Sequence, residues 1–103
     1  MNHPQRIVYP TVDEFYDGLR VYIHYCPKAV FREVRDPKQT QLGFTDGDVT
    51  HVLTMETFKA YYAIVHFSDP EKQRRSFADF QETVKLMLGD SLKAHRHAVH
   101  RNP

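Results

Sequence analysis

The clearest pattern lies near the N-terminus, where apolar residues recur every three or four positions between residues 12 and 26. This spacing gathers them on one face of a helix. Thr11 and Glu14 form a capping box in front of it, and Pro27 ends it, because proline cannot continue a helix. We therefore predict a helix over residues 12–26, preceded by an N-terminal arm over residues 1–10.

The middle of the chain has the pattern of a small sheet. Residues 30–34, 41–45 and 49–53 are short apolar-rich runs separated by turn residues. Asp46 and Gly47 favour a hairpin between the last two runs, because both residue types tolerate the positive φ of a type I′ turn. These runs predict a three-stranded antiparallel sheet. The run 49–53 also fits the start of one longer helix that continues to Phe67, and its pattern does not choose between strand and helix.

The last third of the chain has helical spacing again. Thr54 can cap a helix that begins at Met55, and Asp69 with Pro70 starts another. We expect a short turn over residues 70–75 and a restart at Ser76, with apolar spacing that continues through Leu92. The order α-β-β-β-α-α predicts a single small α+β domain over residues 1–103, with the helices on one face of the sheet and a basic tail over residues 94–103.

Composition limits the class of protein. The 103 residues are 41% hydrophobic and carry a formal net charge of +1, which is ordinary for a globular domain. The longest apolar stretch, near residues 60–67, is far shorter than a bilayer requires, and the N-terminus has no signal core. One cysteine cannot form an internal disulfide, so a reducing compartment is the simpler setting. We expect a cytoplasmic protein without a membrane partner.

Histidines offer the first candidate chemistry, because there are seven of them and three lie near the C-terminus. On a helix, His97 and His100 point outward as an i, i+3 pair, whereas His95 turns toward the apolar face. Two imidazoles are fewer than the three or four ligands that a zinc or nickel site needs. His97 and His100 are therefore weak metal candidates. Phosphate-binding and dinucleotide-binding motifs are absent, and we expect no cofactor.

Cys26 is the candidate nucleophile, with His24 two residues before it. Residues i and i+2 of a helix face apart, so His24 cannot easily act as its base. We expect Cys26 to be a small buried apolar residue on the core face of the first helix. No other spacing singles out an acid–base pair, and an enzyme that uses histidine is the least favoured of three interpretations.

Several apolar side chains fall off the predicted core faces. Tyrosine and phenylalanine are favoured at protein interfaces, since they bury a large area at low cost in rotamer entropy. Either a second layer of the fold covers these residues, or they mark a partner surface or a homodimer interface. The candidate apolar anchors are Val21, Tyr25, Ile64 and Phe67, and the candidate charged rim is Arg74, Arg75 and Arg96.

The sequence thus favours a small non-catalytic protein that docks on a larger protein. It would act as a regulator, as an accessory subunit, or as an inhibitor of the kind that phages and mobile elements encode. The alternative is nucleic-acid binding through the C-terminal basic region, because residues 70–103 hold seven Lys or Arg and four Asp or Glu. Asp79, Glu82 and Asp90 interrupt that basic stripe.

Overall fold

Four strands form one mixed sheet in the computed structural model, which describes residues 5–62 and 69–92. The strands are β1 (Gln5–Val8), β2 (Arg32–Val34), β3 (Gln41–Thr45) and β4 (Val49–Thr54). Their spatial order is β1-β4-β3-β2. β4 pairs with β3 in antiparallel and with β1 in parallel, which makes β1 and β2 the two outer strands.

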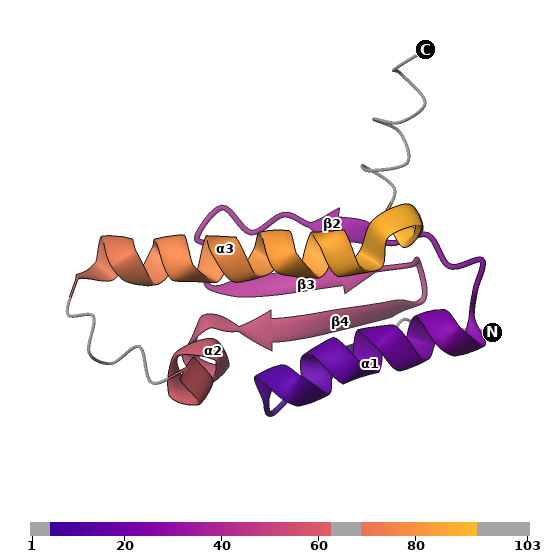
Figure 1. Ribbon diagram of the computed structural model, residues 1–103, viewed down its shortest axis with the longest axis horizontal. Coiled ribbons are helices and arrows are strands. Elements are labelled where there is room, and N and C mark those ends of the chain that lie inside the picture. The colour runs from indigo at the N-terminus through magenta and orange to yellow at the C-terminus, as the bar shows by residue number, and fades with distance from the viewer. Residues whose placement is uncertain (1–4, 63–68, 93–103) are drawn as a thin grey trace, which may run out of the picture.

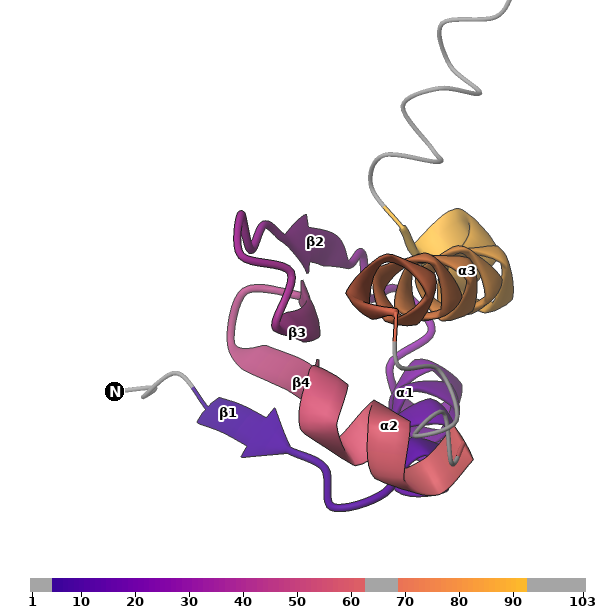
Figure 2. The same ribbon diagram turned by 90° about the vertical axis from the view of Figure 1, so that its left-hand side faces the viewer.

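The helices cover one face of this sheet (Figure 2). They are α1 (Val12–Tyr25), α2 (Met55–Tyr62) and α3 (Pro70–Leu88), and a short 3₁₀ turn η2 (Gly89–Ser91) follows α3. Figure 1 shows α1 and α3 running in the same direction across the sheet, opposite to β4. The core lies between the two layers and includes Phe15, Leu53 and Val84. The α+β class predicted from the sequence is confirmed.

The sheet differs from the prediction in one strand. We expected three antiparallel strands and an arm at residues 1–10, but Gln5–Val8 form β1 and lie parallel to β4. Parallel neighbours cannot be joined by a tight turn, so no local turn signal announces this pairing. The ambiguity over residues 49–53 is resolved, because they belong to a strand that ends at Thr54.

Local signals explain the elements that were predicted correctly. The Thr11 side chain accepts a hydrogen bond from the Glu14 backbone N–H, as the capping box requires. Gly47 has a φ of 102° in the tight turn between β3 and β4, and Asp46 N–H bonds to the Val49 carbonyl. The Thr54 hydroxyl accepts from the Thr57 backbone N–H and begins α2.

α3 is one continuous helix, and the predicted turn over residues 70–75 is wrong. Asp69 caps it by accepting from Glu71 N–H, and Pro70 is its first residue. The helix stops at Leu88, earlier than the apolar spacing suggested, because Gly89 adopts a φ of 50°. The chain then turns so that Phe31 N–H donates to the Ser91 carbonyl, and Leu92 lies beside β2 as a parallel bridge partner of Phe31.

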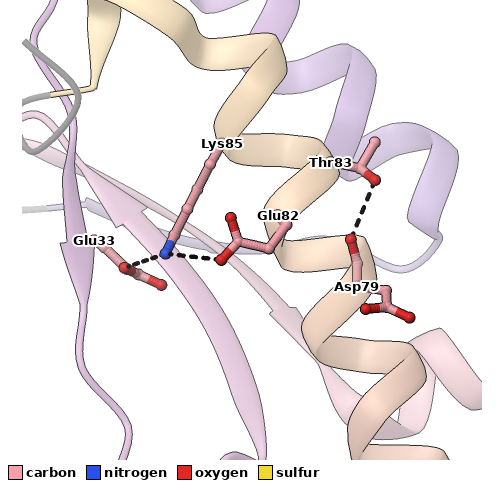
Figure 3. Close-up of polar contacts among 5 residues, drawn as sticks. All are labelled: Glu33, Asp79, Glu82, Thr83 and Lys85. Carbon is pink, nitrogen blue, oxygen red and sulfur yellow. Dashed lines mark hydrogen bonds and ion pairs between the residues drawn. The ribbon is translucent and has the colours of Figure 1, made fainter.

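An ion pair ties α3 to the outer strand β2. Lys85 Nζ lies 3.2 Å from a Glu33 carboxylate oxygen and 3.7 Å from Glu82, its neighbour on the same helix (Figure 3). The Lys85 and Glu33 side chains are about a quarter exposed, so solvent screens their attraction. Within the helix, the Thr83 hydroxyl donates to the Asp79 carbonyl. The edge of the sheet at β2 is therefore covered by α3 and by the residues that follow this helix.

Candidate interaction groove between α1 and β1

At the other edge of the sheet, β1 and the helix α1 border an open groove of about 650 Å³. We call it the α1–β1 groove. Its wall and floor are mostly aromatic or aliphatic: Ile7, Tyr9, Val21, Tyr22, Tyr25 and His51. Glu14 and Asp17 lie at its acidic end. An apolar hollow with a few polar groups is the usual form of a binding site.

The sequence of α1 makes one wall of the groove. Positions 14, 18, 21 and 25 recur every three or four residues, so they lie on one side of the helix, next to the buried side. Gly18 is the point at which the Tyr9 ring crosses the helix, because a Cβ at residue 18 would collide with the Tyr9 hydroxyl. A glycine in mid-helix costs about 1 kcal/mol relative to alanine, and here it makes room for the ring.

His51 forms the floor and is almost completely buried, with 2% of its surface exposed. Its Nδ1 lies 2.7 Å from the Tyr9 hydroxyl, and the two rings stack at 5.8 Å. Tyr22 and Phe31 meet it edge-on. Its Nε2 has no hydrogen-bond partner among the described residues. Burial lowers the pKa of His51, and the Asp46 carboxylate opposes this only in part, so the imidazole is neutral at pH 7.

Tyr9 and Tyr22 are also held in their neutral forms. Burial, and then the Asp46 carboxylate that accepts the Tyr22 hydroxyl at 2.5 Å, raise the pKa of Tyr22. Burial raises the pKa of Tyr9. The groove therefore offers uncharged aromatic rings along its length and carboxylates at one end. This lining suits apolar side chains of a partner, with basic groups near Glu14 and Asp17.

Two of the predicted anchors line the groove. Val21 is 53% exposed and Tyr25 is 77% exposed, and both stand on the same wall. Arg74 and Arg75 are exposed on the first half of α3. This half of α3 lies near the N-terminal end of α1 (Figure 1). The two arginines do not line the groove. The remaining candidates lie outside the described residues: Ile64, Phe67, Arg96, His97 and His100.

Cys26 is exposed, and the expectation that it is buried on the core face is wrong. Its backbone N–H caps α1 by bonding to the Tyr22 carbonyl, so Cys26 lies just past the last helical residue, Tyr25. It lines the groove beside Tyr22, and no hydrogen bond joins it to His51 within the described chain.

Sequence reasoning missed the floor and the second wall of the groove. Ile7 and Tyr9 fall within the arm that was predicted over residues 1–10. His51 falls within the predicted run 49–53, and in the structure it faces the aromatic layer. The available signal was the two-residue period of β4: His51 and Leu53 share one face of the strand, and they pair with the core residues Phe44 and Leu42 of β3.

The rest of the described surface offers less. A polar hollow between α3 and the loop after β2 includes Arg74 and Lys85, but Lys85 is already paired with Glu33. Across residues 5–62 and 69–92, no three His, Cys, Asp or Glu side chains converge as metal ligands. Within those same ranges, no helix has the length and apolarity that a bilayer crossing demands.

Comparisons with known proteins identify no relative of this chain. The chain matches no protein family, no curated protein and no solved structure at a significant level.

Proposed function

We propose that this protein is a small non-catalytic interaction module that docks on a larger protein through the α1–β1 groove. It would act there as a regulator, an inhibitor or an accessory subunit. One observation carries the proposal: Val21 and Tyr25 are exposed together on the wall of an apolar groove with neutral aromatic floor residues. Large aromatic anchors beside a pocket are typical of the centre of protein interfaces.

The charges of the groove indicate what the partner carries. Glu14 and Asp17 stand at one end, and Asp17 forms an exposed ion pair with Arg20 in which the N–O distance is long, at 3.7 Å. Such a pair contributes little, so Asp17 remains available to a cation of the partner. We expect the partner to present an apolar side chain to Tyr25 and Val21, and lysine or arginine to the acidic end.

The test begins with capture from a lysate of the source organism, with and without nuclease, and identification of the bound protein. The purified partner is then titrated against three forms of this protein: wild type, Val21→Asp with Tyr25→Asp, and Leu86→Asp. Leu86 is a matched control, because it is 80% exposed on α3 and does not line the groove. We expect at least a tenfold loss of affinity for the groove variant and none for the control.

Two results would overturn the proposal. If the groove variant remains folded and binds as tightly as the wild type, the site is elsewhere. If capture disappears on nuclease treatment, the protein binds nucleic acid, and the basic C-terminal region becomes the site to examine.

A further inference from the structure

The two outer strands of the sheet are protected to different extents. The free side of β2 is partly covered, since Phe31 N–H bonds to the Ser91 carbonyl and Leu92 lies beside it. β2 is also only three residues long. In the described chain, nothing pairs with the free side of β1, although all its residues are exposed. Natural proteins usually protect such an edge with a bulge, a proline or an inward charge.

The backbone of β1 shows which groups this edge presents. Gln5 N–H donates to the Asp48 carbonyl, and Tyr9 N–H donates to the Val52 carbonyl. Since backbone groups alternate in direction along a strand, residues 5, 7 and 9 bond to β4. The N–H and C=O groups of Arg6 and Val8 therefore point away from the sheet. Arg6 does not shield them, because its side chain donates to Gln41 on the same sheet.

We propose that β1 pairs with β1 of a second copy of this chain, in antiparallel, about a two-fold axis perpendicular to the sheet. The axis passes midway between the two copies of Ile7, so that Ile7 lies opposite Ile7 of the second copy. Arg6 then lies opposite Val8 of the second copy, and Val8 opposite Arg6. Each of these pairs exchanges two backbone hydrogen bonds, and every outward group of Arg6 and Val8 is satisfied.

The side chains fit this register. The two arginines are not opposite each other, because each faces a valine, so the pairing avoids like-charge repulsion. Ile7 lies on the helix-covered face and lines the α1–β1 groove, so the pairing of the two isoleucines places two grooves side by side. An antiparallel two-fold pair keeps the helices of both copies on one side. The β1 strand of a second copy presents the same outward N–H and C=O groups in the complementary register. For this reason we assign the edge to self-association.

The paired edge is short, so we expect an interface at the small end of the usual range and a dimer that dissociates at micromolar concentration. The first experiment measures molar mass by light scattering or sedimentation over a concentration series. Val8→Pro removes an outward N–H and no bond to β4, whereas Val8→Ala removes the side chain and keeps the N–H. We expect at least a tenfold weaker dimer for Val8→Pro than for Val8→Ala, with matching circular dichroism.

The second experiment does not depend on how a proline is tolerated. Residues opposite each other at a non-hydrogen-bonded position have Cα atoms about 4.5 Å apart, within the range for a disulfide. In a Cys26→Ser background, we expect Ile7→Cys to form a covalent dimer under mild oxidation. Leu86→Cys on α3 is more accessible, since Leu86 is 80% exposed and Ile7 is 37% exposed, yet it should cross-link only at the rate of random collision.

A wild-type chain that stays monomeric at its highest soluble concentration overturns the proposal, as does cross-linking of Ile7→Cys no faster than that of Leu86→Cys. Dimers that persist in Val8→Pro show that another surface associates. The inference is independent of the proposed function, because it uses the backbone of Arg6 and Val8 rather than the side chains of Val21 and Tyr25. A monomeric Val8→Pro that still binds the larger partner would support both.

Discussion

Two aromatic clusters lie between the helices and the sheet, and they are built from different chemistry. One, the phenylalanine cluster, consists of Phe15, Phe58, Phe77 and Phe80, with centroids 5.2 Å apart for Phe58 and Phe77 and 5.4 Å apart for Phe58 and Phe80. The other, the histidine cluster, places His51 against Tyr9, Tyr22 and Phe31 at 5.1–5.8 Å. The rings of both clusters thus pack at similar distances. The phenylalanine cluster contains only hydrocarbon side chains, whereas the histidine cluster surrounds the titratable imidazole of His51.

The difference shows how the fold combines a stable core with a surface for binding. The phenylalanine cluster gains its stability from burial alone, which salt and mild changes of pH leave nearly unchanged. The histidine cluster must keep hydroxyls and an imidazole bonded or neutral, and it forms the floor of the α1–β1 groove. Its polar groups orient the rings that line the groove, at the cost of making them sensitive to pH.

The largest expected effect is in the phenylalanine cluster. Phe58→Ala should lower the free energy of unfolding by about 3–5 kcal/mol, because a buried ring is lost and a cavity remains. Denaturant titration at pH 7 measures this loss. The affinity of the folded fraction for its partner should be unchanged, since Phe58 does not line the groove. A loss below about 1 kcal/mol would mean that the cluster repacks freely.

The next effect links the clusters through α1. Gly18→Ala should destabilise the protein by about 1–2 kcal/mol, because the new methyl group displaces the Tyr9 ring from His51. The same change in a Tyr9→Ala background should instead be neutral or stabilising by up to about 1 kcal/mol, through better helix propensity. Thermal or chemical unfolding of the four proteins completes the cycle, and equal effects in both backgrounds would contradict it.

The pH dependence separates the clusters most directly. His51 has a lowered pKa when folded, so below about pH 6.5 the unfolded chain binds the proton more readily. Stability should fall as the pH drops through that value, by at most about 1.4 kcal/mol per pH unit, and level off once the pH is below the folded pKa. We expect His51→Phe to lose this slope between pH 7.5 and about 5.5, and Phe58→Ala to keep it. A wild-type slope retained in His51→Phe would contradict the assignment.

The smallest effect lies outside both clusters. Lys85→Gln removes the ion pairs with Glu33 and Glu82 and should cost no more than about 1 kcal/mol, because the charges are partly exposed. The loss should disappear at high salt, where the wild-type pairs are screened. A salt-independent loss would instead indicate that the Lys85 stem packs on β2.

Elements with local signals were predicted from the sequence, and those that depend on distant partners were not. Thr11 and Glu14 located the start of α1, and Asp46 with Gly47 located the hairpin. β1 was missed because its exposed residues show no buried alternation, and its partner strand is distant in the chain. The exposure of Val21 and Tyr25 followed from helix periodicity, but the groove required β1 and His51 as well. Gly89 ended α3 although apolar spacing continued, since spacing does not register backbone conformation.

The pairing of the first strand with the fourth has a consequence for how the chain is made. Gln5 pairs with Val49, so β1 leaves the ribosome before β4 and has no sheet partner until the hairpin of β3 and β4 has emerged. Closing so long a loop costs chain entropy that local contacts do not repay, which favours formation of the hairpin first and late addition of β1. During synthesis, Ile7 and Val8 remain unpaired and open to chaperones or to neighbouring nascent chains.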